Sequence, residues 1–221
     1  MNAHPEYVFI HEYYDNEMSD VKNTYMVICI PKNANTWLRH NLRIKSAITN
    51  PSIINKVVVL RDPIERWASG IAEYLSSIPG RQRNERLILE FFKKAKEGVT
   101  NYGLKVKALG PDGAEGLDAH TKPQNRFVSK FISKSEESST TWFYLDEQFT
   151  ENFFSWVSDN KLTIPNKHVK KLNFTEKNTR KSDLIKHYLD LFSKDDFLQS
   201  KVKYFYQEDF DLIERVKFYG K

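Results

Sequence analysis

The sequence predicts an α/β protein with three layers, in which a mostly parallel central sheet is flanked by helices. Strand-like and helix-like segments alternate from Tyr25 to Gly80, and this alternation is typical of a parallel sheet. The strand-like segments are apolar throughout, as strands covered on both faces are. A length of 221 residues suits one domain. We therefore expect a single domain over residues 1–221.

The first third of the chain contains two predicted strands. Residues Tyr25 to Ile30 are continuously apolar and partly β-branched, and Lys56 to Leu60 repeat that pattern. A helix is expected from Thr36 to about Ala47, because the residue before a proline disfavours helix, and Asn50-Pro51 follows. Each strand is thus followed by a short turn.

The elements after the second strand are mostly helical. Pro63 suits the first turn of a helix, and apolar residues then recur at helical spacing up to Pro79-Gly80. Four glycines and two prolines make residues 99–123 mostly a loop, and a loop of that length often has a function. The remaining predictions are helices over Glu85–Glu97, Asp146–Asn160, Asp183–Phe192 and Gln207–Lys217, and a strand over Thr140–Leu145.

The composition is that of a folded protein of a reducing compartment. Charged residues make up 29%, hydrophobic residues 40% and aromatic residues 14% of the chain. Cys29 is the single cysteine, so no disulfide can form within the chain, and its apolar strand predicts a buried, inert thiol. No segment approaches about 18 apolar residues, and the N-terminal region lacks the order of a signal peptide. We expect a cytoplasmic protein with no membrane association.

The turn after the first strand has the features of an anion-binding site. Lys32 supplies a mobile positive charge and Thr36 a hydroxyl group. The first N–H groups of a helix lack partners within the helix, and the helix dipole favours an anion there. Asn33 and Asn35 tolerate the left-handed conformation that a tight loop can demand. Lys32 could instead be a solvated lysine, Thr36 a plain helix cap and Trp37 a core residue.

The second turn repeats the arrangement of strand, cation and helix. Arg61 directly follows the strand and can bind a phosphate through its planar guanidinium group. Ser69 lies two turns along the following helix, on roughly the same face as its start. Arg66 has a structural alternative, which is an ion pair with Asp62 across one helical turn. Two such turns suggest a ligand with two separated anionic groups.

These turns resemble the two cofactor-binding motifs of the sulfotransferases that use 3′-phosphoadenosine 5′-phosphosulfate (PAPS). The first motif is Pro31-Lys32-Asn33-Ala34-Asn35-Thr36-Trp37, with Asn33-Ala34-Asn35 where many relatives have glycine or cysteine, and the second is Arg61-Asp62-Pro63-Ile64-Glu65-Arg66-Trp67-Ala68-Ser69. Three further segments are similar to elements of the carbohydrate branch of that family. They are His120-Thr121-Lys122-Pro123-Gln124, Leu172-Asn173-Phe174-Thr175 and Tyr206-Gln207-Glu208-Asp209-Phe210-Asp211-Leu212.

The resemblance implies a P-loop-like sulfotransferase fold, PAPS as the cofactor and 3′,5′-adenosine bisphosphate (PAP) as its product. It implies that Arg61 and Ser69 hold the 3′-phosphate. It also implies that the first loop surrounds the 5′-phosphosulfate, through Lys32, Asn33, Ala34, Asn35, Thr36 and Trp37. A sulfuryl group would pass in line to a carbohydrate or small-molecule hydroxyl. By analogy with phosphoryl transfer, positioning and charge stabilisation should dominate that step, and the scheme requires no metal ion.

Sulfuryl transfer to a hydroxyl needs a group that removes the proton. Lys32 would neutralise the transferring group and the leaving phosphate. His120 is the first candidate for the base, because a neutral imidazole near pH 7 can accept a proton. Its alternatives are hydrogen bonding within its own loop or binding the substrate. His11 is the second candidate, and Glu12 or Glu73 is the third.

Two other functions stay open on the sequence alone. The first is a P-loop-type nucleotide kinase, with Asp62 as the partner of magnesium. The loop after the first strand has no glycine, however, and its lysine precedes the loop instead of ending it. The second is a non-catalytic module that binds anionic glycans or nucleic acid, which the net charge of +5 would suit. We expect a small acceptor and no nucleic acid.

Overall fold

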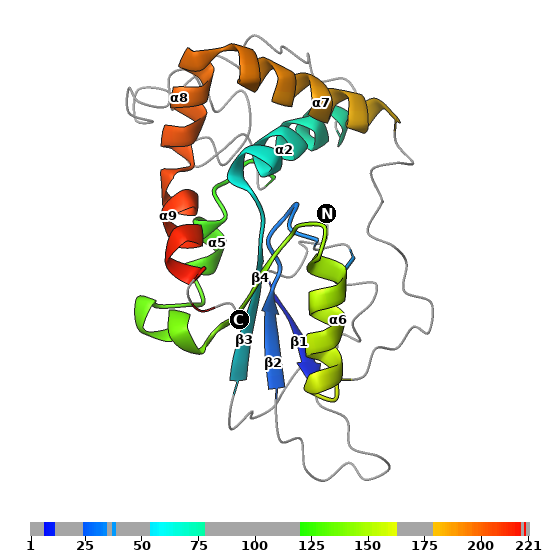
Figure 1. Cartoon of the computed structure of the whole chain (residues 1–221), viewed down its shortest axis with the longest axis vertical. Coiled ribbons are helices and arrows are strands. Elements are labelled where there is room, and N and C mark those ends of the chain that lie inside the picture. The colour runs from blue at the N-terminus through cyan, green and yellow to red at the C-terminus, as the bar shows by residue number, and fades with distance from the viewer. Residues whose placement is uncertain are drawn as a thin grey trace. The chain divides into compact units, whose positions relative to one another are not determined.

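The computed structural model describes residues 7–11, 24–34, 37–38, 54–77, 120–162, 179–217 and 219. The predicted helix over Glu85–Glu97 and residues 99–119 of the predicted loop lie outside these residues, and of the helix over Thr36–Ala47 only Trp37 and Leu38 are described. The elements, in chain order, are β1 (Tyr7–His11), β2 (Thr24–Ile28), β3 (Ile54–Leu60), α2 (Pro63–Ser77), α5 (Asn125–Val128), the 3-10 helix η3 (Lys134–Ser139), β4 (Thr141–Tyr144), α6 (Phe149–Asp159), α7 (Thr179–Lys194), α8 (Asp196–Phe205) and α9 (Gln207–Val216) (Figure 1).

The four described strands form one sheet in the order β1-β2-β3-β4. Strands β2, β3 and β4 run parallel to one another, and β1 pairs antiparallel with β2. The parallel strands and the helices between them confirm the α/β class. All three predicted strands are present, with ends that differ by up to two residues, whereas β1 was not predicted.

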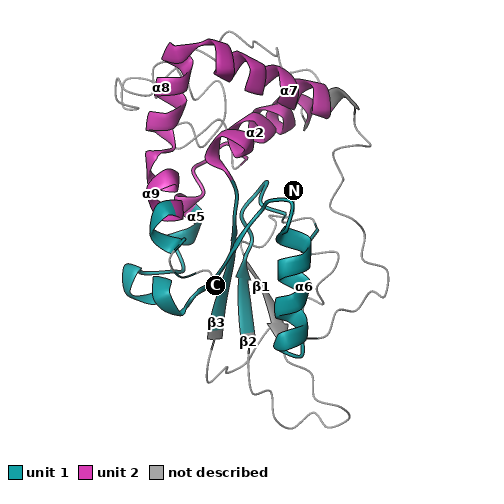
Figure 2. Ribbon diagram, viewed as in Figure 1, with its two compact units in different colours: residues 1–61, 127–172, 214–221 teal, residues 62–126, 173–213 magenta. Residues whose placement is uncertain are grey.

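The chain divides into two compact units (Figure 2). Unit 1 contains residues 1–61, 127–172 and 214–221, and therefore the sheet, η3 and α6. Unit 2 contains residues 62–126 and 173–213, and therefore α2, α7, α8 and most of α9. The prediction of a single domain stays a prediction.

One face of the sheet in unit 1 packs against α6. Successive strand residues face opposite sides of a sheet, and the side chains that meet α6 are Val27, Cys29, Val57 and Val59. Helix α6 contributes Phe149, Phe153 and Val157 to the same cluster. The opposite face is also buried, at Ile28, Val58, Leu60 and Trp142. Burial on both faces explains the uninterrupted apolar runs of β2 and β3.

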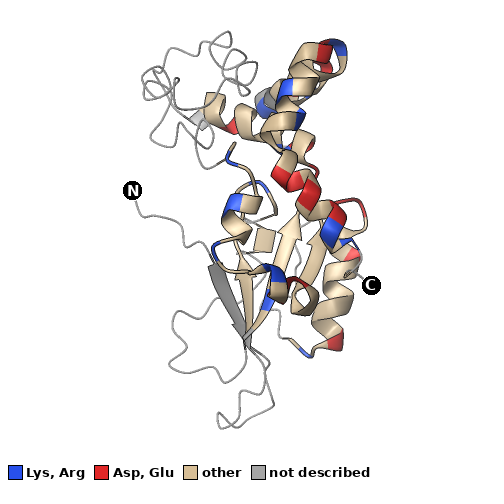
Figure 3. Cartoon of the chain, turned by 90° about the vertical axis from the view of Figure 1, so that its left-hand side faces the viewer, with Lys and Arg blue, Asp and Glu red and all other residues tan. Residues whose placement is uncertain are grey.

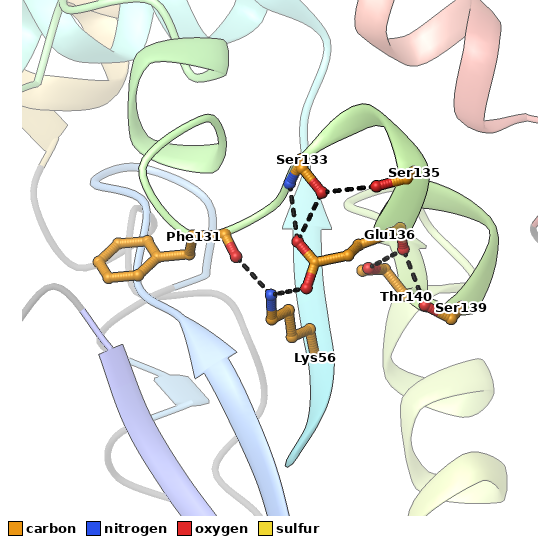
Figure 4. Close-up of polar contacts among 7 residues, drawn as sticks. All are labelled: Lys56, Phe131, Ser133, Ser135, Glu136, Ser139 and Thr140. Carbon is orange, nitrogen blue, oxygen red and sulfur yellow. Dashed lines mark hydrogen bonds and ion pairs between the residues drawn. The ribbon is translucent and has the colours of Figure 1, made fainter. Parts of the chain in front are cut away.

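Lys56 links β3 to the segment around η3 through polar contacts (Figure 4). Its Nζ donates to the carbonyl oxygen of Phe131 at 2.6 Å and to Oε1 of Glu136. The other carboxylate oxygen of Glu136 accepts hydrogen bonds from the N–H and the hydroxyl of Ser133, at 2.9 and 2.8 Å. The hydrogen bond from Lys56, followed by those from Ser133, lowers the pKa of Glu136 to about 2.

Helix α6 ends in a Schellman motif. The N–H of Leu162 donates to the carbonyl of Val157 and that of Lys161 to the carbonyl of Ser158, both at 2.9 Å. Such a motif needs a left-handed residue, usually glycine, just after the helix. Here that residue is Lys161, with a φ of 51°, so a side chain occupies a position where it is strained.

In unit 2, α2 packs on α7 and α8 along the apolar face that its sequence predicts. Trp67, Ala68 and Ile71 are fully buried. Trp67 meets Tyr188 edge to face, with ring centroids 5.9 Å apart, in a cluster that includes Leu198 and Val202. Helix α8 was not predicted. None of the helices within the described ranges is long and apolar enough to cross a membrane.

We expect Phe153→Ala to lower the free energy of unfolding by about 3–5 kcal/mol, because it leaves a cavity in the core. Phe153 is 0% exposed, and its ring lies 5.2 Å from that of Phe143 and 5.5 Å from that of Trp37. Denaturant unfolding monitored by circular dichroism measures the change. The control is Asn152→Ala, at an exposed position of the same helix, which should change stability by less than about 0.5 kcal/mol. Equal effects of the two would contradict this packing.

We expect Lys161→Gly to raise the free energy of unfolding by up to about 1 kcal/mol, because glycine adopts positive φ without steric cost. Thermal unfolding measures the difference. Lys161→Ala removes the same charge and keeps the strained β-carbon, so it should give no such gain. A gain from alanine equal to that from glycine would assign the effect to charge.

Candidate functional site

The chain turns directly from β2 toward a helix at the loop Pro31 to Ala34. The N–H of Asn33 donates to the carbonyl of Ile30 at 3.1 Å, which closes the turn. The N–H of Leu38 donates to the carbonyl of Ala34 at 2.9 Å, and this is the spacing of a helical hydrogen bond. The predicted sequence of strand, lysine-bearing loop and helix start is therefore present.

Two residues of this loop have left-handed backbone conformations. Lys32 has a φ of 70° and Ala34 a φ of 56°, whereas Asn33 between them has no positive φ. Asn33, which could tolerate a left-handed conformation, does not adopt one, and Asn35 lies outside the described residues. Each left-handed residue with a side chain costs roughly 1–2 kcal/mol. Residues of alternating hand direct successive N–H groups into one concavity, and this arrangement binds anions.

Asn33 anchors the loop to the neighbouring strand. Its side chain is 1% exposed, and Nδ2 donates to the carbonyl of Val59 at 2.9 Å. The pairing of β2 with β3 ends at Ile28 and Val58, so this bond continues the connection one residue beyond the last backbone pair. The side chain of Asn33 thus points into the protein and ties the loop to β3.

Arg61, in the second predicted turn, contacts the first turn. Its Nη1 donates to the carbonyl oxygen of Lys32 at 3.3 Å. The two residues follow adjacent parallel strands, and the carboxyl ends of such strands lie at the same edge of a sheet, where ligands of α/β proteins bind. Unit 1 therefore brings together Lys32, Asn33, Ala34 and Arg61, with both cations half-buried.

Two other predicted residues of unit 1 lie away from this edge. Trp37 is buried in the core, with its ring centroid 5.5 Å from those of Phe149 and Phe153. His11 pairs with Thr24, the first residue of β2, whereas the Lys32 loop follows the last. At roughly 3.3 Å per residue, β2 separates the two by about 13 Å. Thr36 and Glu12 lie outside the described residues.

In unit 2, Ser69 lies close to the turn that runs from His120 to Asn125, the turn of His120. Ser69 lies in α2 and is 7% exposed. A β-carbon added at the next residue, Gly70, would lie 2.5 Å from the carbonyl oxygen of His120 and 3.0 Å from Cγ2 of Thr121. A side chain at position 70 would therefore displace the turn. The absence of a side chain at Gly70 lets this turn rest directly on α2.

Two buried residues hold the turn of His120 from the other side. The hydroxyl of Tyr206 donates to the carbonyl of Thr121. Asp209 accepts hydrogen bonds from the N–H groups of Gln124, at 2.9 Å, and Asn125, at 2.8 Å. The segments that resemble the His-x-x-Pro-Gln and Tyr-x-x-Asp elements are thus in contact. No sequence pattern indicates that these two segments are in contact, so Tyr206 and Asp209 were missed as site residues.

Acidic residues are concentrated in α9 (red in Figure 3), and one of them is buried. The four are Glu208, Asp209, Asp211 and Glu214, of which Asp209 is 0% exposed and the others are exposed. Burial raises the pKa of Asp209 to about 6, against the opposing effects of Arg66 and of the two N–H groups. Glu208 raises it slightly further.

Arg66 is 0% exposed and acts electrostatically on Asp209. The predicted alternative was an ion pair with Asp62. Oδ1 of Asp62 caps α2 by accepting hydrogen bonds from the N–H groups of Ile64 and Glu65, both at 2.9 Å. Arg66 therefore belongs to the buried polar cluster of Tyr206 and Asp209.

Glu73, a candidate base, forms an ion pair with Lys181 at 2.7 Å. Lys181 lies in α7. The pair connects α7 to α2 within unit 2. Both side chains thus have a structural role in the packing of these helices.

Comparisons of this chain with protein-family models, curated proteins and solved structures found no match. Among the residues that the structure describes, no group of three or more histidine, cysteine, aspartate or glutamate side chains could hold a metal ion. The resemblance to sulfotransferases therefore stays an interpretation of the sequence motifs.

We expect Asp209 to make the protein less stable as the pH rises from about 4 to about 6. Its pKa rises from 3.8 to about 6 on folding, so the folded state binds more protons in this range. Its contribution to stability is therefore largest below pH 4 and falls by about 3 kcal/mol as the pH passes 6. Denaturant unfolding at several pH values measures the slope.

Asp209→Asn should remove most of this slope, because asparagine does not titrate. The control is Asp211→Asn, at an exposed position of the same helix, which should keep the wild-type slope. Glu136 acts below this range, since its lowered pKa makes stability fall as the pH drops from 4.5 toward 2. Identical slopes for Asp209→Asn and the wild type would contradict the burial of an ionisable Asp209.

Proposed function

We propose that this protein is a PAPS-dependent sulfotransferase that acts on a carbohydrate or small-molecule hydroxyl. The observation that carries the proposal is the loop of alternating backbone hand at Lys32, Asn33 and Ala34, with the guanidinium group of Arg61 against it. Strained backbone persists where a site requires it. A lysine and an N–H concavity at the end of a parallel strand suit a phosphate or sulfate group.

Each part of the loop has a role in the proposed site. The backbone N–H groups of the concavity would bind the 5′-phosphosulfate, and the Lys32 ammonium group would neutralise the charge that develops on the leaving 5′-phosphate. Asn33 would hold the loop in place through its bond to Val59. Arg61 and Ser69 would hold the 3′-phosphate, as the resemblance implies.

The reaction transfers one sulfuryl group. The acceptor oxygen forms a bond to sulfur as the bond between sulfur and the bridging oxygen of the 5′-phosphate breaks. The electron pair of the broken bond stays on PAP. His120 accepts the proton of the acceptor hydroxyl, so the products are a sulfate ester, PAP and a protonated histidine. Catalysis in this scheme consists of positioning and charge stabilisation.

The alternative of a nucleotide kinase gains no support from Asp62. The kinase hypothesis used its carboxylate to hold magnesium, whereas the carboxylate caps α2. A dependence on magnesium nevertheless distinguishes the two enzymes, because P-loop kinases bind their nucleotide with that ion.

We expect PAP to raise the melting temperature without magnesium. At about 100 times the dissociation constant, the ligand adds about 2.7 kcal/mol to the free energy of unfolding, which is roughly 5–10 °C for a chain of this size. Lys32→Ala and Arg61→Ala should each weaken PAP binding by roughly 10- to 100-fold, through loss of a charged hydrogen bond. Differential scanning fluorimetry with a PAP titration measures both effects.

The control for charge is Lys134→Ala, which removes one exposed lysine at η3 and should leave the PAP titration unchanged. No stabilisation by millimolar PAP in a folded sample would rule out the cofactor. Stabilisation by ATP with magnesium, and none by PAP, would favour the kinase. Stabilisation by heparin or RNA that falls with salt, again without an effect of PAP, would favour the binding module.

A further inference from the structure

The turn from His120 to Asn125 is held through its backbone. Tyr206 donates a hydrogen bond to the carbonyl of Thr121, and Asp209 accepts hydrogen bonds from the N–H groups of Gln124 and Asn125. These backbone contacts fix the path of the chain between Thr121 and Asn125. Thr121 and Gln124 are both fully buried, whereas His120 is half-buried. The turn thus has a buried part that is held in place, at Thr121 and Gln124, and a more accessible histidine at its start.

The turn also packs closely against α2. The distance of 2.5 Å between the carbonyl oxygen of His120 and the β-carbon position of Gly70 means that the turn already touches the backbone of α2. Interiors packed in this way have two sides that constrain each other. The turn is therefore in contact with α2 at His120 and Thr121, and with Tyr206 and Asp209 at Thr121, Gln124 and Asn125.

We infer that Asp209 and Tyr206 are positioning residues for His120, which set the orientation in which the turn presents its imidazole. The role of His120 as the base rests on the proposed function, whereas the hold on the turn rests on the contacts alone. Arg66 supports the arrangement, because a buried carboxylate without a nearby cation and N–H donors would be strongly destabilising.

Exposed contacts on the same turn provide a contrast. Arg126 and Asn125 each contact Glu208, at 3.3 and 3.1 Å, and these groups are exposed to solvent. Exposed ion pairs contribute between about 0 and 1 kcal/mol and tolerate many geometries. Such exposed contacts do not fix the orientation of the turn. The buried contacts of Asp209 and Tyr206 are the ones that can fix it.

The test is a titration of the His120 imidazole by ¹H–¹³C NMR of the full chain with labelled histidine. The chain has 6 histidines, and His120→Gln identifies the signal. We expect Asp209→Asn to move that signal, because an amide cannot accept both backbone hydrogen bonds that the carboxylate accepts from Gln124 and Asn125. Tyr206→Phe, which removes one hydroxyl and no charge, should move the signal. Arg126→Ala should leave the signal unchanged.

Coincident His120 signals in the wild type, Asp209→Asn and Tyr206→Phe would overturn the inference. If Asp209→Asn fails to fold by circular dichroism, Tyr206→Phe decides the question, since it keeps the buried ring. Adding PAP to the same samples separates this inference from the proposed function. An absence of PAP binding counts against the cofactor, whereas an unchanged His120 signal counts against the positioning role.

Discussion

Burial of the parallel strands β2 and β3 on both faces is the constraint on which the site of unit 1 depends. Strands enclosed in this way have a fixed register, because a slip of one residue would exchange the two buried faces. The fixed register places Ile28 beside Val58, so the segments that follow both strands emerge at one edge. The contact between Arg61 and Lys32 is a consequence of that register and not an independent feature.

The elements with long, strongly periodic apolar patterns were the predictable part of the fold. Strands β2 and β3 and helix α2 have such patterns. The sequence of β1 has no pattern that indicates the direction of the strand. The antiparallel pairing of β1 with β2 is what places His11 at the far end of β2. Helix α8 was missed because its exposed aromatic residues, Phe197 and Tyr204, blur the apolar face by which a helix is recognised.

The candidate site was predictable in its positions but not in its internal contacts. The order of strand, cation and helix pointed to Lys32 and Arg61. Which loop residue takes a left-handed conformation depends on the whole turn, so Lys32 and Ala34 could not be singled out by residue preference. Asp209 accepts hydrogen bonds from Asn125 and Gln124, which precede it by 84 and 85 positions. Spacing along a chain carries no information about a contact over such a distance in sequence.

The absence of glycine from the Lys32 loop has a further consequence. A β-carbon at positions 32 and 34 limits the conformations of the unbound and unfolded chain as well as those of the folded loop. Because those β-carbons disfavour the left-handed conformation, the contacts of Asn33 with β3 and of Arg61 with Lys32 must offset the strain of the loop. Signature patterns built around glycine would pass over such a loop, although its backbone has the conformation for which glycine is normally selected.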